Sequence, residues 1–244
     1  MKIVVLGGGL SPERDVSLSS ASLIANALLR KGQKVALVDL YDGIEDDSIA
    51  LETLFREGSA NEYKYDVPEE EPDLEKLIAS HGGRREWVGP RVLEICKSAD
   101  SVFVGLHGSH GENGQVQAVL DSAGVKYTGC NYLGCAIAMD KDLSKALIAG
   151  AGYRTADWIT RPYDKITAEK VKEEIGIPCV VKPIGCGSSC GVSVVKSEDE
   201  LQKALDFAAA YKQLILVDII SSLRFSSNTK ITYNTIRHYF RNRI

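Results

Sequence analysis

A glycine-rich loop directly follows an apolar segment near the middle of this chain. Residues 102–106 (VFVGL) are apolar, and residues 107–114 (HGSHGENG) contain three glycines, two histidines, a glutamate and an asparagine. A short apolar run of this kind predicts a buried strand, and residues 115–123 predict the helix that follows it. Because ligands bind at the carboxyl ends of strands in open α/β sheets, the sequence predicts a ligand-binding loop here.

The first part of the chain alternates predicted strands and helices, which is typical of βαβ units. Short helices are also expected within the polar connection 41–90. The expected strands are 3–6, 35–40, 102–106 and 125–128, and the expected helices are 15–31, 51–56, 74–80, 90–98 and 115–123. The pattern predicts an α/β fold that begins with an N-terminal doubly wound parallel-sheet domain over residues 1–138.

A second, α+β domain is expected over residues 139–217. Asp140 is placed to cap its first helix, and Ser197 with Glu200 has the spacing of a capping box. The expected helices are 140–149, 168–174 and 197–211, and the expected strands lie near Trp158 and at 179–182, 192–195 and 214–217.

Composition excludes several classes of protein. The chain is 44% apolar and 25% charged, as in ordinary soluble α/β proteins, and no apolar run is long enough to span a bilayer. The apolar start is too short for a signal peptide, so a cytoplasmic protein without membrane contact is expected. The six cysteines form no C-x-x-C pair, which disfavours disulfides and zinc sites. No basic patch with interleaved aromatic residues occurs in the main body, so nucleic acid is not expected as a partner.

A second glycine-rich loop, residues 185–191 (GCGSSCG), lies between two expected strands. Its backbone N–H groups could converge on phosphate oxygens, with Lys182 adding a positive charge. A plain glycine-rich hairpin with a surface lysine is the alternative. It is not a Walker A loop, since no Gly-Lys-Ser/Thr opens a helix.

Two further residues are candidates for substrate contact. Glu13 follows a glycine turn near the start of a helix, where it could bind a cationic group or only stabilise the helix terminus. His107 lies at the lip of the expected cleft and could equally be a satisfied strand-end histidine. His110 is left out of the site, and Glu112 and Asn113 are expected to shape the loop through bonds to the backbone.

Four segments together resemble the D-alanine–D-alanine ligases, which are ATP-grasp enzymes. The loop 107–118 matches the family signature His-Gly-x-x-Gly-Glu-(Asp/Asn)-Gly, and all four segments occur in the order of the family. They are residues 6–17 (LGGGLSPERDVS), 107–118, 127–129 (YTG) running on to 139–141 (MDK), and 180–183 (VVKP) with 187–192 (GSSCGV). The resemblance extends from residue 1 to about residue 217.

The resemblance implies ATP-dependent ligation of two D-alanines through an acyl phosphate, for the synthesis of a peptidoglycan precursor. It places Glu13 at the ammonium of the first D-alanine, with His107 and Ser188 also at this substrate and Ser188 near the transferred phosphate. The implied nucleotide-binding residues are Lys141, Lys182, Gly187, Ser188, Ser189 and Gly191. Magnesium or manganese, a possible homodimer, and relatives that use D-serine or D-lactate as the second substrate are also implied by the family.

The resemblance stops after Val217. Residues 218–244 are basic, although the whole chain has a net charge of −4, and they contain no Gly, Ala, Pro, Val or Glu. A shifted reading frame fits this change better than a divergent terminal strand. The metal-binding carboxylates of the family cannot be matched to residues here. We therefore expect a truncated chain without a C-terminal ATP-grasp domain, which is inactive or a non-catalytic binding remnant.

A dinucleotide-binding oxidoreductase is the other alternative. Gly7 and Gly9 after the first strand, with Asp39 at the end of the second, imitate the Rossmann fingerprint. Pro12 occupies the third glycine position, where it could not allow close packing of helix and strand. This interpretation is therefore disfavoured.

Overall fold

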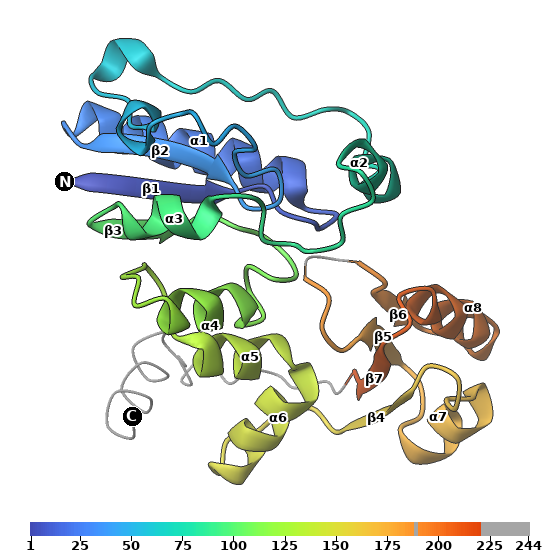
Figure 1. The fold of residues 1–244 in the computed structure, drawn as a ribbon. Coiled ribbons are helices and arrows are strands. Elements are labelled where there is room, and N and C mark those ends of the chain that lie inside the picture. The colour runs from blue at the N-terminus through green and yellow to red at the C-terminus, as the bar shows by residue number, and fades with distance from the viewer. Residues whose placement is uncertain (188–189, 221–244) are drawn as a thin grey trace.

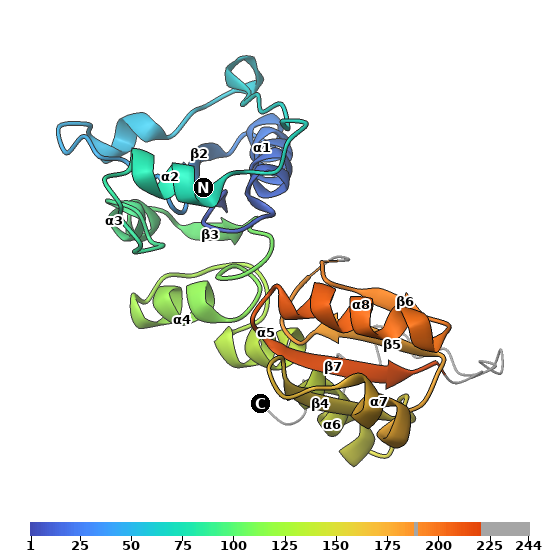
Figure 2. The same cartoon turned by 90° about the vertical axis from the view of Figure 1, so that its right-hand side faces the viewer.

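The computed structural model describes residues 1–187 and 190–220. The chain forms two α/β units, each with its own sheet (Figures 1 and 2). In the part of the chain described, no helix is long and apolar enough to cross a membrane. The predicted residues Ser188 and Ser189 lie outside the described residues, as does nearly all of the predicted tail 218–244.

The first unit is built on a parallel sheet with strand order β2-β1-β3, in agreement with the predicted fold class. Its strands are β1 (Lys2–Gly7), β2 (Lys34–Asp39) and β3 (Ser101–Val104). Its helices are α1 (Arg14–Arg30), α2 (Leu74–Ser80), α3 (Val92–Lys97) and α4 (Gln115–Ser122), with 3-10 turns η1 (Leu51–Leu54) and η2 (Ser59–Asn61). The expected strand 125–128 is reduced to a single parallel bridge between Val102 and Tyr127.

Helices cover both faces of this sheet because successive strand residues point to opposite sides. Val5 of β1 packs with Ala21 and Leu29 of α1. Val4 and Leu6 pack on the opposite face in a cluster that includes residues of α3 and α4. The sheet is therefore doubly wound, as the alternating pattern predicted.

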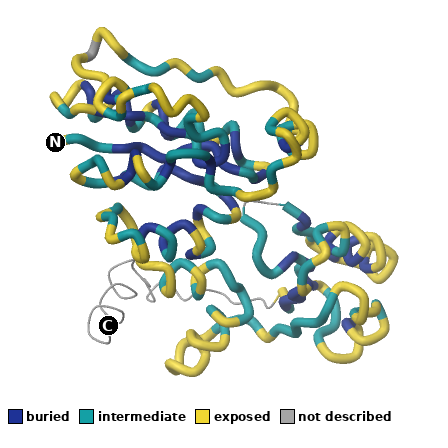
Figure 3. The backbone as a smooth tube through the Cα atoms, in the orientation of Figure 1, coloured by how far each residue is buried: buried dark blue, intermediate teal, exposed yellow. Residues whose placement is uncertain are grey.

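Two helices lead from the first unit to the second. They are α5 (Tyr132–Met139), which the sequence analysis did not predict, and α6 (Lys141–Gly150), whose first turn is capped by the side chain of Asp140. Neither helix contains a fully buried residue (Figure 3).

The second unit is an antiparallel sheet with strand order β4-β7-β5-β6. Its elements are β4 (Trp158–Pro162), α7 (Ala168–Glu174), β5 (Cys179–Pro183), β6 (Ser193–Val195), α8 (Glu198–Ala209) and β7 (Leu214–Ile219). The capping box is confirmed, since Glu200 Oε2 accepts a hydrogen bond from the backbone N–H of Ser197 at 3.2 Å. Strand β7 extends two residues beyond the predicted end at Val217.

The two faces of this second sheet differ in chemistry. Cys179, Val181, Ile215 and Val217 face α7 and α8 and form an apolar core with Leu201 and Leu205. The alternate residues face the other way, so Lys182, Asp218, Trp158 and Thr160 share the face toward α6. The polar face therefore carries the lysine that the sequence analysis assigned to phosphate binding.

Candidate functional site

The carboxylate of Glu13 lies between two glycine-rich loops. Glu13 is the N-cap residue of α1, but its side chain accepts no capping hydrogen bond. A methyl group on Gly108 would lie 2.7 Å from Glu13 Oε2, and one on Gly187 would lie 3.5 Å from the same oxygen. Glu13 therefore does not cap α1 with its side chain, and the structure brings the turn after β1 together with both loops.

The loop between β3 and α4 is held by its own polar side chains. Glu112 Oε2 accepts a hydrogen bond from the N–H of Gly108 at 2.7 Å, and Asn113 Oδ1 accepts one from the N–H of Gln115 at 3.1 Å. The prediction that these two residues shape the loop is confirmed. Buried Gln117 adds a bond from Nε2 to the carbonyl of Gly111 at 2.7 Å.

His107 and Glu13 are linked through a serine that the sequence analysis missed. The Oγ of Ser11 accepts a hydrogen bond from the N–H of Glu13 at 3.0 Å and donates one to the carbonyl of His107 at 3.2 Å. The His107 ring lies 3.1 Å from Ser20 Oγ, measured from Nε2. The half-buried imidazole therefore lies against the first turns of α1.

His110 fixes the same loop from the other side. Its ring stacks on Trp87 with centroids 4.8 Å apart and an interplanar angle of 15°. Burial lowers the pKa of His110, which favours the neutral ring in this stack. Its φ of 67° lies in the left-handed region, so the stack holds a backbone conformation that histidine seldom adopts.

Lys182 forms an ion pair with Asp218, which is shared with a second lysine. Asp218 Oδ1 lies 2.7 Å from the Nζ of Lys145 on α6, while Oδ2 pairs with Lys182. Asp218 is only 8% exposed. Two ammonium groups around one carboxylate leave a net positive charge on this group of three side chains, which suits an anion.

Lys145 is held in turn by aromatic and polar neighbours. Its Nζ lies 5.0 Å from the centre of the Trp158 ring, a cation–π arrangement. The Nε1 of Trp158 and the hydroxyl of Thr160 both donate to Asp142 Oδ1, at 2.6 and 2.9 Å. These contacts fix α6 on the polar face of the second sheet.

Lys141 lies at the start of α6 and reaches the glycine loop 185–191. Its Nζ donates to the carbonyl oxygens of Ile184 and Cys186, at 3.0 and 2.7 Å. Burial lowers the pKa of Lys141, and the positive charge of Lys182 lowers it further. The two predicted lysines are thus brought together beside the loop.

The described part of this loop is anchored at both ends. The N–H of Gly185 donates to Gln213 Oε1 at 3.0 Å. Gly191 has a φ of 69°, and a methyl group there would lie 2.5 Å from Pro183 Cγ and 2.8 Å from the Tyr211 ring. Only glycine fits this position without a shift of its neighbours.

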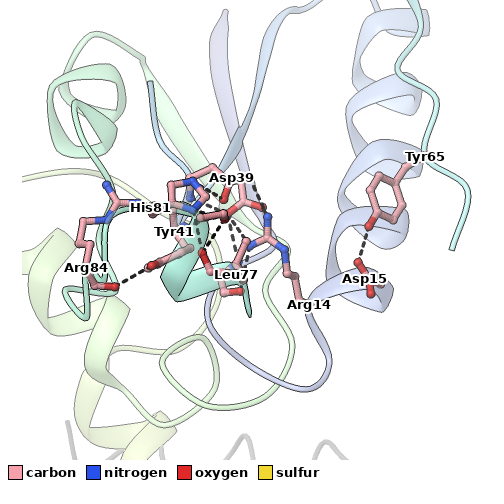
Figure 4. Close-up of polar contacts among 11 residues, drawn as sticks. Arg14, Asp15, Asp39, Tyr41, Tyr65, Leu77, His81 and Arg84 are labelled. Carbon is pink, nitrogen blue, oxygen red and sulfur yellow. Dashed lines mark hydrogen bonds and ion pairs between the residues drawn. The ribbon is translucent and has the colours of Figure 1, made fainter. Parts of the chain in front are cut away.

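Asp39 is held by groups of the protein itself (Figure 4). Its Oδ1 accepts hydrogen bonds from the backbone N–H groups of Tyr41 and Asp42, at 2.8 and 3.1 Å, and its Oδ2 lies 2.7 Å from Nη2 of buried Arg14. Burial raises the pKa of Asp39, and Arg14 partly offsets this. A carboxylate held in this way is a poor partner for ribose hydroxyls, which argues further against the dinucleotide interpretation.

The same arginine connects the cluster to the crossover segment after β2. Arg14 Nη2 lies 2.7 Å from Asp42 Oδ2, and Asp42 Oδ1 lies 3.4 Å from Nε2 of His81. Figure 4 shows Arg14 and His81, the two ends of this chain of contacts, near Tyr41. It holds the turn that precedes Glu13 against the rest of the first unit.

The described residues do not form a magnesium site. In residues 1–187 and 190–220, no three His, Cys, Asp or Glu side chains lie together as a metal ion requires. Asp218, the acidic residue on the polar face, is already paired with two lysines. The metal that the resemblance implies therefore has no supporting donor set in this part of the chain.

Three residues of the site were missed by the sequence analysis: Ser11, Lys145 and Asp218. The spacing of Lys141 and Lys145 could have indicated a second lysine, because residues four apart lie on one face of a helix. Ser11 and Asp218 give no such signal, since their partners are distant in the sequence.

Two family models match most of the chain. One, described as "D-ala D-ala ligase N-terminus", matches residues 2–130, and "D-ala D-ala ligase C-terminus" matches residues 147–224. Both glycine-rich loops and Lys182 fall inside these two ranges, and Lys141 lies between them.

Curated relatives and solved structures agree with this match. The chain is 37% identical over 220 residues to the D-alanine–D-alanine ligase of Lacticaseibacillus casei, which covers 89% of this chain and 60% of that protein. It is 40% identical over 231 residues to the enzyme of Pediococcus pentosaceus, which covers 93% and 64%. The crystal structure of the ligase from Bacillus anthracis superposes with a TM-score of 0.61 at 25% identity, over 89% of this chain and 57% of that one. The chain thus spans about 60% of the length of these relatives, and it belongs to the D-alanine–D-alanine ligase family.

Proposed function

We propose that the described residues bind one D-alanine and the phosphates of ATP, for the ATP-dependent joining of two D-alanines. The observation that carries this proposal is the position of the Glu13 carboxylate between Gly108 and Gly187. Gly187 belongs to the loop 185–191, which also accepts a hydrogen bond from Lys141. The loop 185–191 thus lies next to the Glu13 carboxylate and next to the Lys141 ammonium. This pair of charges suits a substrate with an ammonium at one end and a carboxylate to be phosphorylated at the other.

Glu13 is the proposed partner of the D-alanine ammonium. It lies at the amino terminus of α1, and its side chain does not cap the helix. His107, whose carbonyl shares Ser11 Oγ with the N–H of Glu13, is proposed to contact the same substrate from the β3–α4 loop. Ser188 is proposed as a further contact to this substrate on the basis of the family resemblance.

Lys141 and Lys182 are the proposed phosphate partners, together with the loop residues Gly187, Ser188, Ser189 and Gly191. Transfer of the terminal phosphoryl group to the D-alanine carboxylate gives an acyl phosphate and ADP. The amine of the second D-alanine then attacks the acyl carbon, and phosphate leaves. Positioning and charge neutralisation are sufficient for such chemistry, so no protein nucleophile is needed.

Calorimetric titration with D-alanine, L-alanine and D-lactate in the presence of a non-hydrolysable ATP analogue tests the substrate assignment. We expect Glu13→Gln to weaken D-alanine binding by about tenfold, which is the loss of one charge-assisted hydrogen bond. D-Lactate lacks the ammonium and should bind equally to both proteins. Asp15→Asn, which removes a neighbouring charge on the same helix turn, is the matched control and should leave D-alanine binding unchanged.

The reaction itself is tested by phosphate release from ATP that depends on D-alanine. The expectation from the sequence, that the 244-residue chain does not turn over, stays a prediction. Turnover at about 1 per second or faster, as in ordinary enzymes, would contradict it.

A further inference from the structure

Ser11 is a buried serine in the turn between β1 and α1, and it is 2% exposed. Its hydroxyl accepts the N–H of Glu13 at 3.0 Å and donates to the carbonyl of His107 at 3.2 Å. The two partners are 94 positions apart in the sequence and come from different loops. One hydroxyl therefore joins the backbones of both residues proposed to contact the first substrate.

The geometry leaves little freedom around this hydroxyl. A methyl group on Gly108 would lie 2.8 Å from Ser11 Oγ and 2.7 Å from Glu13 Oε2. The hydroxyl and the carboxylate thus both lie against the same glycine, whose N–H is bound by Glu112. We therefore expect a shift of Ser11 to displace the Glu13 carboxylate from its place next to Gly108.

A second buried serine provides an internal comparison. Ser17, in the first turn of α1, is fully buried and donates to the carbonyl of Gly105 at 3.0 Å. It joins the same two segments as Ser11, but its partner is neither Glu13 nor His107. Loss of the Ser17 hydroxyl removes one buried hydrogen bond, whereas loss of the Ser11 hydroxyl removes two, so Ser11→Ala should cost at least as much stability as Ser17→Ala.

We propose that Ser11 is a positioning residue that sets the separation between the Glu13 carboxylate and the His107 imidazole, and thereby the affinity for the first amino acid. This inference rests on the proposed function for its effect on D-alanine. Ser17 serves only the packing of α1 on the loop. The two serines therefore differ in role although both are buried and each donates to a carbonyl of the segment that follows β3.

The first test compares Ser11→Ala and Ser17→Ala in the full chain. We expect Ser11→Ala to weaken D-alanine binding by about five- to tenfold, the scale of a lost buried hydrogen bond, and Ser17→Ala to change it less than about twofold. Urea unfolding should show a loss of stability for both variants, at least as large for Ser11→Ala as for Ser17→Ala. In a Glu13→Gln background, Ser11→Ala should cause little further loss, because Ser11 acts through Glu13. Equal D-alanine affinities in the two serine variants would overturn the proposal.

A second measurement does not depend on substrate. We expect the ring proton resonances of His107 in NMR spectra to shift in Ser11→Ala and to remain in place in Ser17→Ala. Unmoved His107 resonances in Ser11→Ala would overturn the inference whether or not D-alanine binds. A wild-type chain that binds no D-alanine, but whose His107 resonances respond to Ser11→Ala, would refute the proposed function and still support the coupling by Ser11.

Discussion

The Nζ of Lys141, at the start of α6, donates a hydrogen bond to the carbonyl oxygen of Cys186 at 2.7 Å. The ammonium group is therefore part of the support of the glycine loop as well as a charge beside it. Lys182, in contrast, is held by a side chain, Asp218, which a competing anion can replace. The two lysines are expected to respond differently to substitution.

Replacement of Lys182 by alanine is expected to weaken the binding of an ATP analogue by about 1–3 kcal/mol, the scale of a charge-assisted hydrogen bond. Lys182 lies on the polar face of the sheet, where its ammonium is proposed to contact the phosphates alone. The loss of affinity is therefore expected only for ligands that carry phosphates. Titration with the analogue and with adenosine checks this. Equal affinity of wild type and variant for the analogue would show that the loop is not a phosphate site.

Replacement of Lys141 by methionine is expected to change how stability depends on pH. Burial lowers the pKa of Lys141 below its ordinary value of 10.5, so the unfolded chain binds its proton more tightly. Stability from this group therefore rises as the pH rises through the lowered pKa toward 10.5. Urea unfolding at several pH values in this window should show the rise for wild type relative to Lys141→Met. Parallel curves of stability against pH for wild type and Lys141→Met would contradict a lowered pKa of Lys141.

Replacement of Asp218 by asparagine is expected to destabilise the second unit. It leaves the ammonium groups of Lys145 and Lys182 partly buried and without a counter-charge, and broken buried pairs of this kind cost about 3 kcal/mol or more. Urea unfolding measures the loss. Asp164→Asn, at an exposed aspartate, is the matched control and should change stability by less than about 0.5 kcal/mol. Similar losses of stability in the two variants would contradict the sharing of the Asp218 carboxylate by Lys145 and Lys182.

Replacement of Gly108 by alanine is expected to displace the Glu13 carboxylate. Gly108 and Gly82 both have positive φ angles, of 76° and 66°, so an alanine at either position costs about 1 kcal/mol of backbone strain. A methyl group on Gly82 meets nothing within 4 Å, whereas one on Gly108 meets Glu13. We expect only Gly108→Ala to weaken D-alanine binding, by about tenfold. Titration of both variants with D-alanine checks this, and equal binding would contradict the placement of Glu13.

Much of the fold could be predicted because the spacing of apolar residues and the helix-capping residues agree with the structure. The helix Ala168–Glu174 has the predicted bounds, and Asp140 caps α6 as expected. Helix α5 was missed because its sequence, YLGCAIAM, is almost wholly apolar and so shows no amphipathic period. Asn131, whose side chain accepts the N–H of Gly134, was the available signal for its start.

The site could be predicted only where the residues lie in a recognisable local pattern. The glycines of both loops and the lysine after β5 are of this kind. The link from Ser11 to His107 and the sharing of Asp218 depend on contacts across 96 and 36 to 73 positions, which follow from tertiary packing alone. No spacing along the chain could have indicated them.

The alternation of β7 sets a limit on insertions and deletions. Val217 lies in the apolar core, and the next residue, Asp218, lies between the lysines. A shift of one residue in the pairing of this strand would exchange the two faces. The aspartate would enter the core and the valine would face both ammonium groups. Changes in length within the turn between α8 and β7 should therefore be tolerated only if that pairing is kept.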